Sequence, residues 1–159
     1  MAHSLFPPLN LPPARLRVVG GAAGGGRPSV LCLSRGRYVA LTPEEWVRQH
    51  FMSFMVGSLG FPRSLVAVEV PVLIGSSRQR ADIVAYSRRM EPLVIVECKA
   101  PSVSLSQQTL NQACRYLSVL GARFVVLTNG LSHYCVALSE RGTPTYREGL
   151  PRWEQLADT

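Results

Sequence analysis

The spacing of apolar residues predicts a helix that begins at Thr42. Thr42 can serve as the N-cap, Pro43 occupies the first helical position, and Glu45 follows three residues after the cap, as in a capping box. Apolar side chains then recur every three or four positions until Gly60 and Pro62 end the pattern.

Two glutamates in the first turn of this helix are expected to differ in role. Glu44 precedes Val47 by three positions and Phe51 by seven, so we expect its side chain to point towards the core. Glu45 is expected to be used by the cap.

Beyond Arg63 the apolar pattern changes from helical spacing to alternation, which predicts strands. Residues 65–73 and 79–86 are expected to form a hairpin around a turn at 75–77, and residues 93–99 a third strand of the same meander. A second helix is expected from Ser104 or Ser106 to about Leu120, followed by strands at 123–128 and 133–138 and a weak strand near Thr145.

Both ends of the chain are expected to be less regular than the middle. The segment 1–28 is rich in proline and glycine and is expected to be an arm that is mostly loop, with a short strand at 15–19. Residues 30–33 and 37–41 could supply one or two more strands, and all three are expected to be edge elements at best. Residues 29–150 would then form one α/β domain, and residues 151–159 a loose tail.

Composition limits the class of protein. The chain has 159 residues, of which 47% are hydrophobic, enough for one domain with a buried core. It contains no apolar run of roughly 20 residues and no secretory signal at its start, so we expect a cytoplasmic protein without a membrane partner. The four cysteines lie among apolar residues without zinc-site spacing, which predicts buried thiols rather than metal ligands or disulfides.

The charged residues point to a polyanionic partner. The net charge is +7 and the isoelectric point is near 9.8, which favours nucleic acid, although an arginine-rich composition can also arise without function. Sixteen of the 17 basic residues are arginine, and Lys99 is the only lysine. A compact ammonium has therefore been kept at one position, which makes Lys99 a candidate for chemistry.

Three polar residues are expected to meet at the end of the predicted meander. Glu97 and Lys99 end a strand that is otherwise apolar, and their spacing of two places both on one face. Pairing with the preceding strand brings Asp82 near Glu97. Two converging carboxylates suit a hard cation such as Mg²⁺ or Mn²⁺, and Lys99 could then hold a water or offset charge on a phosphodiester. The alternative is an exposed salt bridge at a strand end, which would contribute little.

These residues resemble the PD-(D/E)xK nucleases, which have the restriction-endonuclease-like fold. The chain has Ala81-Asp82 where the motif has Pro-Asp, and Glu97-Cys98-Lys99 as its second half. More narrowly, segments 41–51, 80–84, 96–101 and 128–135 are similar to the N-terminal nuclease domain of type I restriction enzyme R subunits, in its short stand-alone form. The resemblance covers roughly residues 9–150.

The resemblance implies a fold and a set of site residues. The expected fold is a mixed central β-sheet flanked by two main helices, in the order αβββαβ. Asp82 and Glu97 would bind Mg²⁺ or Mn²⁺ with the backbone carbonyl of Cys98, and Lys99 would be the catalytic lysine. Glu44 matches a helical carboxylate that completes or supports the metal shell, although favourable charge at a helix N-terminus explains it nearly as well.

Further residues are assigned more loosely. Gln112 and Tyr116 match a Gln-x-x-x-Tyr element whose glutamine contacts the substrate or a water; a buried amide beside a core tyrosine is the competing interpretation. The predicted nucleic-acid contacts are Arg48, Arg78, Arg80, Arg115 and Tyr116, and some of these arginines are expected to be only solvated surface.

The resulting hypothesis is a Mg²⁺-dependent DNA endonuclease whose products carry a 5′-phosphate and a 3′-hydroxyl. A chain of 159 residues has no room for a motor domain, so translocation would come from elsewhere, through restriction-modification subunits; a homodimer is also compatible. Two alternatives stay open: a non-cleaving DNA-binding or assembly module with the same fold, and an RNA-directed nuclease.

Overall fold

The structure, a computed structural model, describes residues 6–21 and 25–156, without the side chains of residues 116 and 117. Along the chain the elements are β1 (Val18–Val19), β2 (Ser29–Cys32), β3 (Arg37–Ala40), α1 (Pro43–Gly57), η2 (Arg63–Leu65), β4 (Val66–Ile74), β5 (Ser77–Tyr86), β6 (Pro92–Cys98), α2 (Gln107–Ser118), β7 (Phe124–Thr128), β8 (His133–Leu138), β9 (Pro144–Arg147) and α3 (Trp153–Leu156).

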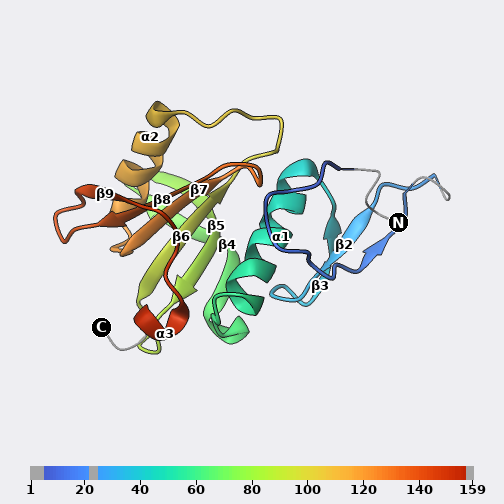
Figure 1. Cartoon of the computed structure of the whole chain (residues 1–159), viewed down its shortest axis with the longest axis horizontal. Coiled ribbons are helices and arrows are strands. Elements are labelled where there is room, and N and C mark those ends of the chain that lie inside the picture. Colours follow the sequence, from blue (N-terminus) through green and yellow to red (C-terminus); the bar gives the residue numbers. More distant parts are fainter. Residues whose placement is uncertain (1–5, 22–24, 157–159) are drawn as a thin grey trace.

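The centre of the fold is a mixed sheet with one helix on each face (Figure 1). Its six strands follow the order β4-β5-β6-β7-β8-β9, and all neighbours are antiparallel except β6 and β7, which are parallel. The central strand β6 is buried on both faces: Val94 and Val96 pack in the core that α1 covers, and Ile95 packs against α2. This alternation determines which face of the sheet receives each polar residue at the end of β6.

Helix α1 begins where the sequence predicts. The Thr42 hydroxyl accepts a hydrogen bond from the backbone N–H of Glu45 at 3.0 Å, and Pro43 follows the cap. Val47, Phe51 and Met55 then form the buried stripe that packs on the sheet. The helix therefore holds its first turn, and the charged residues in it, beside the ends of β5 and β6.

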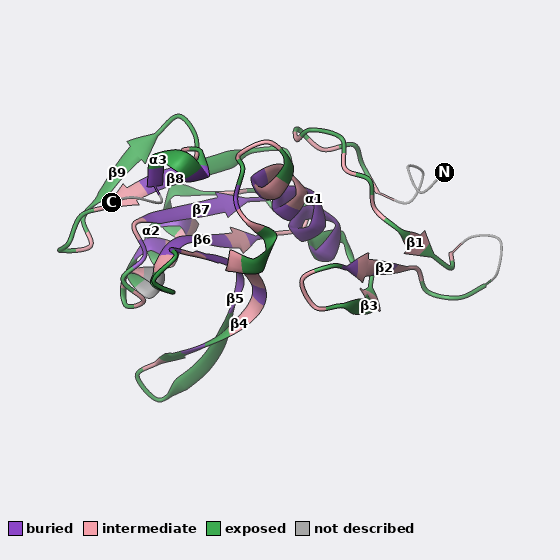
Figure 2. Cartoon of the chain, turned by 90° about the horizontal axis from the view of Figure 1, so that it is seen from below, coloured by how far each residue is buried: buried purple, intermediate pink, exposed green. Residues whose placement is uncertain are grey.

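The β4–β5 hairpin changes direction at Glu69. Val66 and Val68 belong to the core on the α1 side, whereas Val70 and Val72 belong to the core on the α2 side. Even-numbered residues of a regular strand share one face, and Glu69 breaks the alternation with a φ of 49°. The outer half of the hairpin then extends away from the sheet as an exposed arm (Figure 2).

The N-terminal strands differ from the sequence-based expectation. They were predicted as edge elements, but β1, β2 and β3 form a separate antiparallel sheet on the far side of α1 from the main sheet (Figure 1). Trp46 of α1 forms a small buried cluster with Val30 of β2 and with Leu41, which follows β3. A large aromatic side chain on the outer face of α1 gives these strands a surface to bury, which explains why they pair with each other.

The C-terminal segment is also more ordered than predicted. Residues 153–156 form the short helix α3 rather than a loose tail, and residues 157–159 lie outside the described part of the chain. Trp153 and Leu156 are buried, and the Trp153 N–H donates to the Leu59 carbonyl at 2.9 Å. The segment closes the end of the core beside α1. Among the described residues, no helix combines the length and the apolar character that crossing a membrane requires.

Candidate active site

Asp82 lies where strands β5 and β6 separate. The hydrogen-bonded ladder between them ends at Ile83 and Val96, so Asp82 and Glu97 are the next pair beyond the last rung. Asp82 fills this gap with its carboxylate. Its Oδ2 accepts from the Cys98 N–H at 2.7 Å, and its Oδ1 accepts from Arg48 Nη2 at 2.7 Å.

Glu97 and Lys99 share a cavity on the α2 face. This cavity has a volume of 230 Å³, and it is lined by Gln79, Arg80, Glu97, Lys99, Thr109, Gln112, Ala113 and Leu127. Three of the predicted catalytic residues, Glu97, Lys99 and Gln112, and the predicted DNA contact Arg80 are thus brought together around one space. Gln112 is exposed on α2, so it is not a buried amide.

The surroundings of the Glu97 carboxyl disfavour its charged form. Burial and the neighbouring Asp82 carboxylate raise its pKa to about 8, although the Lys99 ammonium opposes this shift. Its Oε1 is buried and has no hydrogen-bond partner among the described residues. A buried carboxylate oxygen without a donor, beside a second carboxylate, is what a bound cation would satisfy.

The first turn of α1 reverses the predicted roles of its two glutamates. Glu44 does not point into the core: its side chain is 47% exposed, with its Oε1 3.5 Å from Arg48 Nη2. Burial and the Asp82 charge raise the pKa of Glu44, while Arg48 and Lys99 lower it, so Glu44 does lie at the edge of the site. Glu45 is the buried one, and its carboxylate pairs with Arg35 and Arg48 instead of returning to the cap. The helix wheel was misleading because Arg35, which lies outside α1 on the β2–β3 turn, provides the charge that allows Glu45 to be buried.

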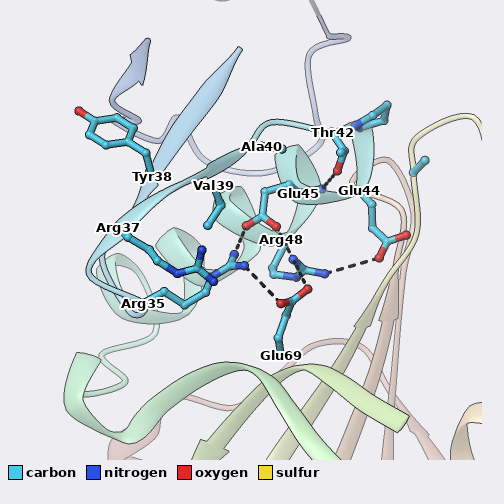
Figure 3. A pocket seen from close by; sticks show the side chains of 12 residues that line it. Arg35, Arg37, Tyr38, Val39, Ala40, Thr42, Glu44, Glu45, Arg48 and Glu69 are labelled. Atoms are coloured by element: carbon cyan, nitrogen blue, oxygen red, sulfur yellow. Dashed lines mark hydrogen bonds and ion pairs between the residues drawn. The ribbon is translucent and has the colours of Figure 1, made fainter. Parts of the chain in front are cut away.

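Arg48 does not fit the predicted role of a phosphate contact. Its side chain is 6% exposed and pairs with Asp82. It also pairs with Glu45 and, at 3.6 Å, with Glu69 (Figure 3). Burial would lower the pKa of Arg48, but its hydrogen bond to Asp82 and the nearby carboxylates raise it above its ordinary value. A guanidinium so engaged is an internal partner of the acids.

The three other arginines predicted to contact nucleic acid lie on the surface. Arg80 is 70% exposed at the mouth of the 230 Å³ cavity, and Arg78 is exposed two residues further out on the hairpin arm. Arg115 is exposed on α2, and the side chain of Tyr116 lies outside the described part of the structure.

The residues present fit a divalent cation held by few protein ligands. Among the described residues no three His, Cys, Asp or Glu side chains are arranged to hold an ion by themselves. Asp82 and Glu97 would supply two carboxylates, and the remaining ligands would be a backbone carbonyl, water and phosphate oxygens. Mg²⁺ accepts such a ligand set, because it commonly binds through one or two carboxylates and keeps its other positions for water and substrate.

Sequence reasoning missed the ionic cluster behind Asp82. It consists of Arg35, Glu45, Arg48 and Glu69, from the β2–β3 turn, α1 and β4. Cys32 and Gln49 extend it, through hydrogen bonds of 3.2 Å from Arg35 Nε to Cys32 Sγ and 2.8 Å from Gln49 Nε2 to Glu45 Oε1. Glu45, Arg48 and Gln49 lie within about one turn of the same helix and gave a local signal. Arg35 and Glu69 come from other elements and follow no motif, so their part in the cluster could not be predicted.

A comparison with protein families identifies the chain. The family model described as the type I restriction enzyme R protein N terminus (HSDR_N) matches residues 43–151, which include every predicted site residue. The chain belongs to this family. The three N-terminal strands lie outside the matched range, so the Arg35 end of the ionic cluster is supplied by a part of the chain that the HSDR_N match does not cover.

A solved structure agrees with the HSDR_N fold. The fragment structure of a putative HsdR subunit of a type I restriction enzyme from Vibrio vulnificus YJ016 superposes with a TM-score of 0.51 at 21% sequence identity. The match covers 73% of this chain and 24% of that chain, so this chain spans about a quarter of the length of that structure. No curated protein matches the chain. The predicted mixed sheet with two main helices is confirmed.

Proposed function

We propose that this chain is a DNA endonuclease that hydrolyses phosphodiester bonds with Mg²⁺ or Mn²⁺ held by Asp82 and Glu97. The observation that supports the proposal is that Asp82 and Glu97 lie just beyond the last rung of the β5–β6 ladder, where Glu97 and Lys99 line one cavity. Membership of the HSDR_N family supports a role related to restriction. Association with other restriction-modification subunits belongs to the same proposal.

Each residue has a distinct task in the proposed reaction. The cation, when bound, would withdraw charge from the phosphate and make water a better nucleophile at neutral pH. Lys99 would donate hydrogen bonds to the attacking water or to a phosphate oxygen and offset the negative charge that develops on phosphorus oxygens. Gln112 would orient water or substrate from the opposite wall of the cavity, and the Cys98 carbonyl and Glu44 would complete the ligand shell.

The surface arginines would hold the DNA backbone. Arg78, Arg80 and Arg115 are exposed around the cavity mouth or on the elements that form its walls, where guanidinium groups can contact phosphates. Arg48 is left out of this set because it is buried against Asp82.

Plasmid cleavage tests the proposal. Supercoiled DNA is incubated with the full chain in Mg²⁺, Mn²⁺ or EDTA, and the wild type is compared with Asp82→Asn, Glu97→Gln and Lys99→Ala. Each variant should lose at least about 100-fold in cleavage rate. Glu140→Gln and Arg141→Ala, exposed on the β8–β9 turn, are matched controls that should cut like the wild type. Equal cleavage by Lys99→Ala and Asp82→Asn would show that the site is elsewhere.

One observation favours a second function, a DNA-binding or assembly module that does not cut alone. Both Asp82 oxygens already accept hydrogen bonds, one of them from the Arg48 guanidinium. If this pairing persists in Mn²⁺, the chain will retard DNA in gels without cleaving it. Cleavage that appears only after addition of a partner subunit would identify the module as one that a partner activates.

A further inference from the structure

Arg48 occupies the position of a positive charge among the acids of the site. One of its terminal nitrogens, Nη2, lies 2.7 Å from Asp82 Oδ1 and 3.5 Å from Glu44 Oε1. The other, Nη1, pairs with Glu45 and lies 3.6 Å from Glu69 Oε1. The guanidinium therefore lies between two groups of carboxylates: Asp82 and Glu44 at the candidate cation site, and Glu45 and Glu69 behind it. Figure 3 shows Glu44, Glu45 and Glu69 around Arg48.

The rear group anchors Arg48 independently of Asp82. Glu45 is fixed by Arg35 and by Gln49 Nε2 at 2.8 Å, and all of these side chains are buried or nearly so. Glu69 adopts a φ of 49°, a backbone conformation that costs energy for a residue other than glycine, and its carboxylate pairs with Arg35 and Arg48. Nη1 can thus stay bound to Glu45 while Nη2 releases Asp82. Glu44 is a second acceptor within reach of Nη2.

Charge balance makes Arg48 and a divalent cation competitors. Without either, Asp82 would face the neighbouring acids Glu97 and Glu44, and like charges repel more strongly where they are partly withdrawn from water. Arg48 relieves this repulsion by direct contact with Asp82. A divalent cation bound to the same carboxylate would then meet an adjacent guanidinium, which lowers the cation affinity.

We propose that Arg48 is a positioning residue that serves as the internal counter-cation of Asp82: it holds the carboxylate in place when no metal is bound and limits the affinity of the site for a divalent cation. This inference rests on the cation site of the proposed function but does not require cleavage. Its Nε, buried without a hydrogen-bond partner among the described residues, is consistent with a guanidinium that is held by its terminal nitrogens alone and can pivot.

Mn²⁺ titration of the full chain, followed by electron paramagnetic resonance of the free ion, tests the inference without DNA. Arg48→Met and Arg48→Gln should each bind Mn²⁺ about ten-fold more tightly than the wild type, because the competing charge is removed. In EDTA both should melt at a lower temperature, and Mn²⁺ or Ca²⁺ should restore more of their stability than it adds to the wild type. Arg48→Lys keeps the charge and should stay within about three-fold of the wild-type affinity.

Arg35→Met is the matched control. Arg35 pairs with the same Glu45 carboxylate but contacts neither Asp82 nor Glu97 in any described interaction. Its loss should lower the melting temperature while leaving the Mn²⁺ affinity at the wild-type value. The inference would be overturned if Arg48→Met bound Mn²⁺ no more tightly than the wild type. It would also be overturned if Arg48→Met and Arg35→Met gained Mn²⁺ affinity equally.

A measurement on the wild type avoids dependence on variants that fold poorly. The ¹⁵Nε signal of Arg48, assigned by its absence in Arg48→Lys, should move on addition of Ca²⁺, and the Arg35 signal should not. If the chain binds Ca²⁺ and the Arg48 signal does not move, the inference that the cation competes with Arg48 for Asp82 is contradicted. If Arg48→Met binds Mn²⁺ more tightly but the chain never cuts DNA, this inference stands and the nuclease proposal fails. The failure of one proposal can therefore be distinguished from the failure of the other.

Discussion

Glu97 shows how the place of one residue on a strand determines its chemistry. It follows four buried apolar residues and shares the face of Ile95, so its carboxyl is partly withdrawn from water on the α2 side. Asp82 meets it from the separating strand. The result is an acid whose pKa is raised to about 8, with one oxygen buried and unpaired among the described residues.

This shift predicts a pH dependence of stability. Because the pKa of Glu97 is 4.5 when unperturbed and about 8 in the fold, the folded chain keeps a proton between these values that the unfolded chain has released. The contribution of Glu97 to stability is therefore complete below pH 4.5 and is lost as the pH rises through 8. Glu97→Gln removes the ionisation, so in EDTA at pH 8 it should melt roughly 5 °C above the wild type, with the gap closing towards pH 5.

Thermal unfolding in EDTA across this pH range, followed by circular dichroism, measures the effect. Glu140→Gln, which changes an exposed carboxyl on the β8–β9 turn, should show no such gap. A gap that widens at low pH would contradict the raised pKa.

Individual residues were predictable where a local rule governs them. Lys99 and Glu97 follow from alternation at the end of an apolar strand, and both do line one cavity. The side-chain positions of Glu44 and Glu45 were predicted the wrong way round, since their burial depends on Arg35, a charge from another element. The same non-local pairing explains why Arg48 is not on the surface.

At the scale of elements, the start of α1 matters because the helix carries Glu44 and Arg48 into the site. Thr42 is its N-cap, with the hydroxyl 3.0 Å from the Glu45 nitrogen. Thr42→Ala should cost about 1 kcal/mol of the free energy of unfolding, because one backbone donor at the helix start loses its acceptor. Urea denaturation measures this cost.

Thr42→Ser keeps the hydroxyl, so its free energy of unfolding should lie within a few tenths of a kcal/mol of the wild type. An equal loss of stability in both variants would show that the methyl group, and not the cap, matters.

The main elements could be predicted because their signals are local. The meander, both main helices and the last three strands of the sheet lie within a few residues of their expected bounds. The separate sheet formed by β1, β2 and β3 could not be foreseen, since it depends on burial against Trp46 across the chain. Helix α3 was missed for the same reason: four residues carry no periodic pattern, and Trp153 becomes ordered only through the core it covers.

At the scale of the whole molecule, α3 closes the core near the end of α1. Trp153 is 7% exposed and its ring lies 5.7 Å from that of Phe61. Trp153→Ala should therefore destabilise the chain by roughly 3 kcal/mol, as loss of a large buried aromatic usually does. Glu154→Ala, on the exposed side of the same short helix, should leave the urea midpoint unchanged. Comparable midpoints for the two variants would indicate that the end of the chain does not support the core.

The net charge of +7 does not by itself say where DNA binds, so single arginine substitutions have to be compared. Fluorescence anisotropy with a labelled duplex in Ca²⁺, repeated over a range of salt concentrations, gives the number of phosphates neutralised from the slope of log affinity against log salt. If the hairpin arm and the cavity mouth hold DNA, Arg78→Ala and Arg80→Ala should each weaken binding and reduce the slope by about 1. Arg141→Ala removes an equally exposed charge on the β8–β9 turn and should leave the slope as in the wild type. Equal effects of all three substitutions would mean that DNA is attracted by the overall charge and not held beside Asp82, Glu97 and Lys99.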